Sequence, residues 1–174
     1  QTNFVVTAAH VVSRAERIEI SDNEGRRVDA SLIALDEARD IALLKAEMTG
    51  RGIILTSRQA PPVGLHACAI GNPFGLGHSF SCGVVSATGR KAGFQAIEDF
   101  IQTDAAINPG MSGGALVDAK GQLIGLINAI YTKEADIDAG VNFAISSDLL
   151  LKGLARLSKA FCSPTGEGML SPCP

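Results

Sequence analysis

Hydrophobic and polar positions form short runs along most of the chain, and this pattern predicts an architecture built mainly of strands. Apolar segments are bounded by Gly, Pro, Asn, Asp or Ser, as is typical of short strands joined by tight turns. Residues 146–159 differ, because their apolar positions recur at helical spacing after a Ser/Asp cap, so we expect a helix there. The other apolar runs predict strands near residues 3–7, 16–21, 26–35, 41–46, 53–56, 65–70, 79–87, 98–103, 114–118, 122–130 and 141–145.

A segment rich in turn formers, SRQAPPVG at residues 57–64, predicts the crossing between two lobes. We therefore expect an N-terminal lobe over residues 1–60, a C-terminal lobe over residues 61–146, and a helix with a tail over residues 147–174. A chain of 174 residues can hold one domain or two small lobes around a sizeable core.

The most informative run is NPGMSGGAL at residues 108–116, in which Ser112 is flanked by glycines. A glycine at position 110 can adopt backbone conformations closed to other residues and can turn its N–H towards a reacting carbonyl oxygen. The N–H groups of Gly110 and Ser112 are then candidates for an oxyanion hole beside a nucleophilic Ser112. The alternative is an ordinary turn, because Gly-Ser-Gly-Gly also occurs without any catalytic role.

Two further segments favour the catalytic interpretation. In FVVTAAHVV, residues 4–12, an apolar strand leads to His10, for which we expect a short turn of helix. In RDIALLK, residues 39–45, Asp40 stands at the start of an apolar strand. Taken separately, such residues are commonly a packed histidine and a strand cap. Together, in the order His, Asp, Ser, they match the triad of the chymotrypsin-type proteases, in which a histidine base activates the serine and the aspartate orients the histidine.

The chain resembles the HtrA/Deg group of trypsin-like serine proteases. The matching segments follow the order of that family along nearly the whole chain, and they are TAAHVV (7–12), DIALLK (40–45), AIGNPFGLG (69–77), GVVSATGR (83–90), IQTDAAINPGMSGGAL (101–116), GQLIGLINAI (121–130) and GVNFAI (140–145). The resemblance implies an all-β fold of two antiparallel, six-stranded-type barrels, the chymotrypsin fold, with the triad His10, Asp40 and Ser112 in the cleft between them and a C-terminal helix after the second barrel.

Three departures from the family pattern bear on these expectations. Met111 stands where the family usually has Asn, so we expect Met111 to support the oxyanion loop by packing alone. The chain begins inside the region of a Gly-Ser-Gly hairpin, which leaves two alternatives: a complete first barrel, or one that is incomplete at its N-terminus. The residues after GVNFAI are too few for the PDZ domain that is common in this family.

The resemblance also places a specificity pocket and regulatory loops. The positions that match the pocket are Ala106 and Ile107 with the strand residues Asn128, Ala129 and Ile130, and they are small or apolar, without an acidic residue. We expect cleavage after Val, Ala, Ile or similar residues, with the substrate added as a strand beside residues 128–130. Packing in the core is the alternative role of Ile107 and Ile130. Residues 93–100, 107–111 and 131–140 match loops that switch between ordered and disordered forms in the family. An ordinary solvated loop is the alternative interpretation of the acidic and polar residues 131–140.

Charge and cysteine content indicate which partners, cofactors and cellular compartment are expected. The net charge of −3 does not favour nucleic acid or anionic lipid as a partner, and no apolar run is long enough to span a membrane as a helix. We expect no cofactor and no metal, since no CxxC or paired His/Cys spacing stands out, and we expect His66 and His78 at the surface. The four cysteines fit an oxidising compartment. We expect at least one disulfide. The pair Cys162–Cys173 is favoured over the pair Cys68–Cys82, and free thiols are the alternative.

The sequence thus predicts a serine endopeptidase that acts on polypeptides, particularly unfolded or misfolded ones, in an extracytoplasmic compartment. The family implies a homotrimer as its assembly. Two alternatives remain open from the sequence: a latent or non-catalytic protein that binds peptides in the manner of a chaperone, and an esterase of restricted substrate range.

Overall fold

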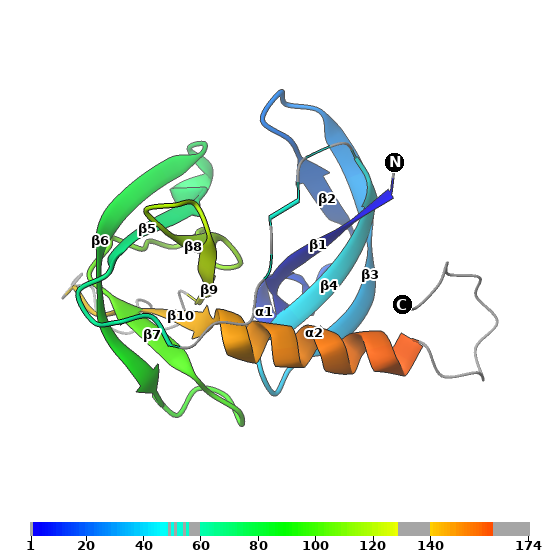
Figure 1. Cartoon of the computed structure of the whole chain (residues 1–174). Coiled ribbons are helices and arrows are strands. Elements are labelled where there is room, and N and C mark those ends of the chain that lie inside the picture. Colours follow the sequence, from blue (N-terminus) through cyan, green and yellow to red (C-terminus); the bar gives the residue numbers. More distant parts are fainter. Residues whose placement is uncertain are drawn as a thin grey trace.

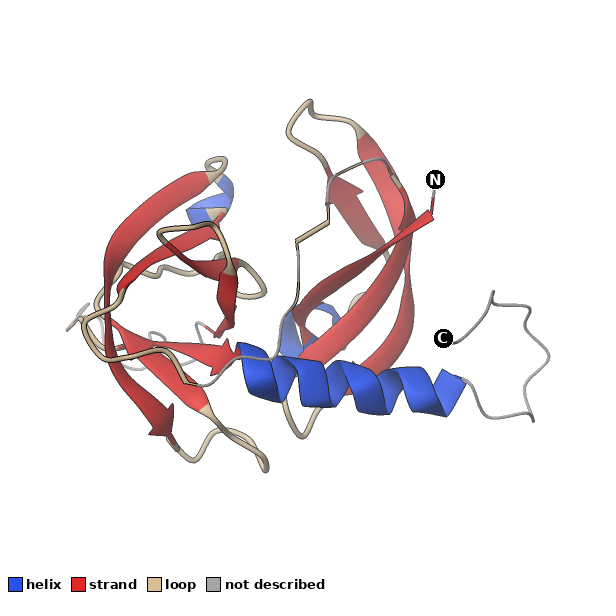
Figure 2. Cartoon of the chain, in the orientation of Figure 1, coloured by secondary structure: helices blue, strands red, loops and turns tan. Residues whose placement is uncertain are grey.

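A computed structural model describes residues 2–48, 50, 52, 53, 55, 60–128 and 140–161. Two β-structures lie side by side, and a C-terminal helix runs from one beneath the other (Figure 1). Strands dominate both lobes, as the run lengths in the sequence predict (Figure 2). The all-β fold with a C-terminal helix is therefore confirmed, whereas the exact division of the chain at residues 60 and 146 stays a prediction.

The N-terminal lobe is a curled, open antiparallel sheet with the strand order β1-β4-β3-β2. Its open form agrees with the alternative of an incomplete first barrel. The strand predicted at residues 53–56 is not formed at Ile53 or Leu55, while residues 54 and 56 lie outside the described part of the chain. The elements of this lobe are β1 (Thr2–Ala8), α1 (Ala9–Val12), β2 (Ile18–Ser21), β3 (Arg27–Asp36) and β4 (Ile41–Glu47).

The C-terminal lobe is a closed barrel with the strand order β10-β7-β6-β5-β8-β9. Its interior is filled by small and branched apolar side chains, among them Ala67, Val85, Ile101 and Leu116, all buried. The elements are β5 (His66–Gly71), the 3-10 turn η1 (Pro73–Gly75), β6 (Ser79–Arg90), β7 (Phe100–Thr103), β8 (Ala115–Asp118), β9 (Leu123–Asn128) and β10 (Asn142–Ser146).

Helix α2 (Ser147–Phe161) joins the two lobes. The hydroxyl of Ser146 accepts a hydrogen bond from the backbone N–H of Leu149 at 3.1 Å, which is the N-terminal cap that the sequence predicts. Leu149 and Leu150 pack in one apolar cluster with Ile41, the first residue of β4. Gly153 lies so close to Ile41 that a Cβ on this glycine would stand 2.6 Å from the Ile41 Cδ1 atom. The helix therefore fixes the start of β4 against the barrel.

The hairpin of β5 and β6 carries a disulfide between Cys68 and Cys82, which are direct partners in the strand register. The other expected pair, Cys162 and Cys173, lies outside the described residues. Among the described residues, no helix has the length and apolar character needed to cross a bilayer.

A single carboxylate organises the loop that precedes β7. Glu98 accepts backbone N–H groups from Ala92, Gly93, Phe94 and Gln95. Burial raises the pKa of the Glu98 carboxyl, but these donors outweigh burial and hold the pKa below its ordinary value of 4.5. The ionised form therefore stabilises the folded loop.

We expect Glu98→Gln to lower the melting temperature at neutral pH, because an amide accepts these N–H groups less strongly than a carboxylate does. The stabilisation is present above pH 4.5 and is lost as the pH falls through the lowered pKa of the folded state. Thermal unfolding of both proteins between pH 7 and pH 3 measures this difference. Glu16→Gln removes an exposed charge outside the loop and serves as the control. A difference that does not shrink in acid would contradict the assignment.

Candidate active site

The strand register brings His10 and Asp40 together. β1 pairs with β4 so that Ala8 lies opposite Ile41, and His10 and Asp40 lie just beyond this pair. The His10 Nδ1 and Asp40 Oδ2 atoms are 2.7 Å apart. The backbone N–H of His10 donates to the other carboxylate oxygen, Oδ1, at 2.8 Å. Both carboxylate oxygens thus hold the histidine, one through its ring and one through its main chain.

Asp40 is held in an uncommon backbone conformation, with φ at 57°. Few residues other than glycine adopt the left-handed region, although Asp and Asn tolerate it better than most. The Asp40 carbonyl accepts the N–H of Ala9 at 3.1 Å, and the residue is only 3% exposed. This conformation lets one residue bond α1 through both its carbonyl and its side chain.

Asn128, at the end of β9, links this pair to the barrel. Its Nδ2 atom donates to Asp40 Oδ2 at 3.0 Å. The sequence predicts Asn128 on the substrate strand but does not indicate this side-chain contact, since the two residues are 88 positions apart. The available signal was an amide at the end of a strand whose residues are all buried.

Met111 anchors the loop that carries Ser112. Its side chain is 1% exposed and belongs to the core of the barrel. The Met111 N–H donates to the Asn108 carbonyl at 3.0 Å, and the Asn108 N–H points to the Met111 sulfur at 3.4 Å. A Cβ on Gly71 would stand 3.0 Å from two Met111 side-chain atoms, so β5 packs directly on this methionine. Met111 therefore holds the loop by packing, as expected.

The loop presents N–H groups beside Ser112. Gly110 has φ at 96°, and a Cβ there would stand 2.6 Å from the Asn72 carbonyl oxygen. The Pro109 carbonyl accepts the Phe74 N–H at 2.8 Å. In a trans peptide the carbonyl and the N–H point in opposite directions, so the Gly110 N–H points away from Phe74. Within the described residues, neither the Gly110 nor the Ser112 N–H donates to a protein acceptor.

Ser112 borders a cleft of about 400 Å³ between the two lobes, which β1 and residues 110–114 line. The neighbouring Gly113 lies against the end of β1: a Cβ on it would stand 2.1 Å from Thr7 Oγ1. No hydrogen bond joins Ser112 to His10 in the part of the chain that the structure describes. Catalytic hydrogen bonds are often long in unliganded enzymes and tighten when substrate binds.

The residues expected in the specificity pocket have different surroundings. Ala106 is half-buried, whereas Ile107 is 1% exposed and packs in the barrel core, in keeping with the alternative role. Ala129 and Ile130 lie outside the described residues, as do positions 131–139 of the expected regulatory loop.

Comparison with known proteins agrees with this geometry. Residues 1–126 match the family model of the trypsin-like peptidase domain. The chain is 43% identical over 149 residues to the periplasmic pH-dependent serine endoprotease DegQ of Escherichia coli K12, covering 84% of this chain and 32% of DegQ. It is 37% identical over 163 residues to the serine endoprotease DegS of the same organism, covering 90% of this chain and 46% of DegS.

Solved structures of HtrA-type and other serine endoproteases are also similar to this chain. The HtrA-type protease AlgW with a decapeptide superposes with a TM-score of 0.84 at 41% identity, covering 90% of this chain and 49% of AlgW. A serine endoprotease from Yersinia pestis gives a TM-score of 0.76 at 37% identity, over 90% of this chain and 54% of that one. The predicted HtrA/Deg resemblance and the chymotrypsin-like fold are confirmed, although the chain spans only about a third of the length of DegQ.

We expect Gly113→Ala to destabilise the protein more than Gly121→Ala. Both glycines have positive φ, at 81° and 72°, so both substitutions strain the backbone by about 1–2 kcal/mol. Only at position 113 does the new methyl group meet Thr7, whereas nothing lies within 4 Å of the Cβ position at Gly121. Overpacking adds about 1–3 kcal/mol to the free-energy loss of Gly113→Ala. Urea unfolding of the two variants measures the difference, and equal losses would contradict the close packing.

We expect Asn128→Ala to weaken the contact between β9 and the His10–Asp40 pair. A hydrogen bond to a charged group contributes about 1.5–3 kcal/mol, so the variant unfolds at lower urea concentration by a corresponding amount. Adding Asp40→Ala, which removes the acceptor, tests the pairing, because a double-mutant cycle isolates the interaction energy of the two side chains. An interaction energy near zero would show that the hydrogen bond makes no net contribution.

Proposed function

Because the chain belongs to the family of trypsin-like peptidase domains, we propose that it is a serine endopeptidase that hydrolyses peptide bonds through an acyl-enzyme. The observation that carries this proposal is the 2.7 Å contact between His10 Nδ1 and Asp40 Oδ2. A carboxylate accepts a hydrogen bond from Nδ1–H and so fixes the tautomer whose Nε2 lone pair is free to act as a base. The side chain of His10 is 32% exposed, so the ring is accessible from solvent.

In the proposed reaction Ser112 Oγ attacks the substrate carbonyl while His10 takes the hydroxyl proton. His10 then gives this proton to the leaving amine, and water repeats the sequence to release the acyl group. Asp40 stays ionised, orients the ring and stabilises the imidazolium that forms. Asn128, which donates to the same carboxylate oxygen as His10, keeps that carboxylate in place.

The oxyanion hole is assigned to the N–H groups of Gly110 and Ser112. The direction of the Pro109 carbonyl and the lack of a partner for either N–H within the described residues support this assignment. N–H donors that are fixed before the reaction stabilise the developing charge without any cost of reorganisation. The same features weigh against the latent, peptide-binding alternative, which would need the Pro109 carbonyl turned into the hole.

The proposed substrates are unfolded or misfolded polypeptides cleaved after small or aliphatic residues. An apolar cleft beside Ser112, lined by Val5, Val11 and Ile70, favours apolar substrate segments over charged ones. AlgW, about half of whose length this chain matches, was solved in the presence of a decapeptide and of a tripeptide. DegQ and DegP of E. coli are named periplasmic, so we propose an extracytoplasmic location, and a homotrimer stays our proposal for the assembly.

We expect a fluorophosphonate probe to label Ser112 alone, with the adduct located by mass spectrometry. Ser112→Ala abolishes the labelling, and His10→Ala slows it on the order of 10⁴-fold, because the hydroxyl loses its base. Asp40→Asn is expected to act similarly through the tautomer of the ring. Labelling at another residue, or equal labelling of His10→Ala, would contradict the assignment.

Measurements of peptide turnover then distinguish an endopeptidase from the two alternatives, an esterase and a non-catalytic peptide-binding protein. A panel of unfolded polypeptides and matched esters distinguishes an endopeptidase from an esterase, and sequencing of the products gives the residue at each cleavage site. Folded protein that binds unfolded casein yet neither cleaves it nor reacts with the probe would support the peptide-binding alternative.

A further inference from the structure

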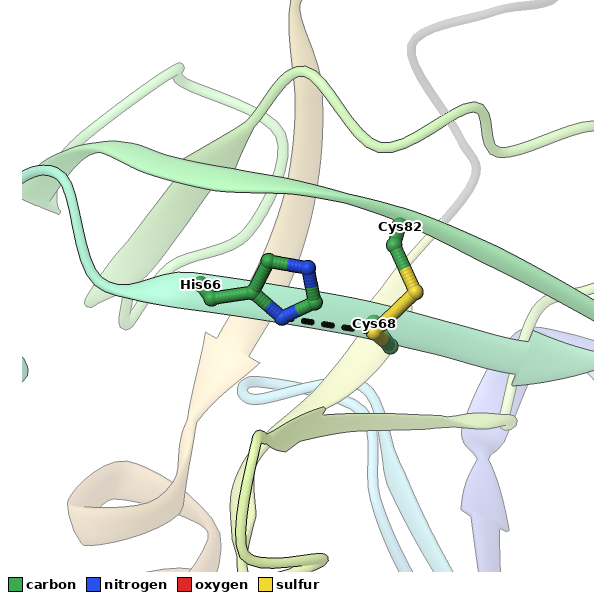
Figure 3. A group of neighbouring side chains, drawn as sticks. All are labelled: His66, Cys68 and Cys82. Carbon is green, nitrogen blue, oxygen red and sulfur yellow. Dashed lines mark hydrogen bonds between the residues drawn. A yellow bond between two sulfur atoms is a disulfide. The ribbon is translucent and has the colours of Figure 1, made fainter.

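The β5–β6 hairpin brings three potential metal ligands together outside the candidate active site. The donor atoms of His66, Cys68 and Cys82 all lie within 4.8 Å of one another. The imidazole of His66 stands next to the disulfide on the same side of the hairpin (Figure 3). Gly71, at the other end of β5, lines the cleft beside Ser112, so the cluster occupies the end of this strand remote from the cleft.

The strand register explains why these side chains meet. His66 and Cys68 are two residues apart on β5 and therefore point to the same face. Cys82 lies directly opposite Cys68 on β6, and Val84 lies opposite His66. Of the four residues in these two neighbouring cross-strand pairs, three are potential metal ligands, and the fourth is Val84. Sequence spacing alone did not reveal the cluster, because its ligands come from two strands.

One pair of ligand atoms, those of His66 and Cys68, has the spacing that zinc requires, whereas the sulfurs of Cys68 and Cys82 are bonded to each other and must separate on reduction. His66 Nδ1 and Cys68 Sγ are 3.7 Å apart. Typical bonds of about 2.1 Å to nitrogen and about 2.3 Å to sulfur, at a tetrahedral angle, place two such ligands about 3.6 Å apart. The nitrogen and this sulfur are therefore already positioned as neighbouring ligands of one ion. Two thiolates and an imidazole are also the donor types that zinc prefers.

The surroundings leave room for one further ligand. Cys68 is 4% exposed and packs in an apolar cluster that includes Val117, its neighbour on β8. His66 and Cys82 are exposed to solvent. An ion held by these three residues would therefore be shielded by the apolar cluster on the side of Cys68 and open to solvent on the other side, where a water molecule could be the fourth ligand.

We propose that the β5–β6 hairpin is a redox-gated zinc site that binds Zn²⁺ when the Cys68–Cys82 disulfide is reduced. A dithiol reductant opens the bridge: one thiolate attacks the exposed Cys82 sulfur, and Cys68 leaves as a thiolate. The second thiol of the reductant then displaces Cys82 and closes the reductant's own disulfide. In total the protein gains two electrons and two protons. Zinc binding displaces both thiol protons and forms two Zn–S bonds and one Zn–N bond.

Either state keeps the two strands joined, by a disulfide when oxidised and by zinc when reduced. Because the same two sulfurs serve both bonds, the oxidised protein has only one of the three ligands free. Metal binding at this site is therefore expected to depend strictly on the redox state of the hairpin.

The test uses the protein reduced with a water-soluble phosphine, which takes an oxygen atom from water as the disulfide becomes two thiols. The phosphine is removed without oxygen, and Zn²⁺ is titrated in competition with a chromogenic chelator. The expected result is one zinc per chain in reduced protein and none at this site in oxidised protein. Replacing Zn²⁺ with Co²⁺ is expected to give the visible absorption and sulfur-to-metal charge-transfer bands of a tetrahedral thiolate complex.

Variants separate this site from general metal binding. Cys82→Ser and His66→Ala are expected to weaken zinc binding by the reduced protein at least about ten-fold, whereas His78→Ala leaves it unchanged. Val84→His adds a histidine opposite His66 and is expected to tighten zinc binding. Circular dichroism follows the fold of each sample.

Three outcomes would overturn the proposal: equal zinc binding by oxidised and reduced protein, no loss of binding in Cys82→Ser, or no zinc binding by reduced protein. If the reduced protein unfolds, zinc is expected to restore its circular dichroism spectrum, and failure to do so also counts against the site.

Discussion

The buried carboxylate of Asp40 is the group on which the arrangement of the site depends. A charge removed from water needs hydrogen-bond partners, because an unpaired one costs several kcal/mol or more. The three donors that meet this carboxylate are the His10 main-chain N–H, the His10 ring and the Asn128 amide. Two of them belong to α1 in the N-terminal lobe and one belongs to the barrel. The solvation of one carboxylate thus requires the two lobes to lie in a single relative position.

Helix α2 also helps to hold the two lobes in this relative position, by packing against both of them. It begins directly after β10 of the barrel, and its Gly153 packs against Ile41, the residue that follows Asp40. The apolar cluster around Ile41 includes barrel residues such as Leu126 and Phe143. Apolar packing, which has little directionality, brings the lobes together, and the hydrogen bonds of Asp40 then select one orientation. The histidine is consequently fixed by contacts that span the whole molecule.

Local features were predictable from the sequence. Two non-local pairings, His10 with Asp40 and Cys68 with Cys82, were also expected, from motif order and from the predicted hairpin, whereas the contacts that depend on how the two lobes dock were not. The apolar runs and the cap at Ser146 predict the six barrel strands and α2, because run length, turn residues and capping are local properties. Leu55 illustrates the limit: its apolar run predicted a strand, but the residue instead packs against the apolar cluster around α2. The contact of Asn128 with Asp40 depends on how two lobes dock. The pairing of Cys68 with Cys82 depends on a register that a one-residue slip would reverse.

Met111 shows how one substitution can change the physical basis of a site without removing it. A polar residue before the nucleophile would stabilise the oxyanion loop through directional hydrogen bonds. Met111 instead fills space in the barrel core and lies against Gly71, while Pro109 and Phe74 bond across the loop. The shape of the loop therefore depends on the packing of the barrel itself. Since a packed core resists small displacements, the Gly110 and Ser112 N–H groups are positioned by the same interior that makes the barrel stable.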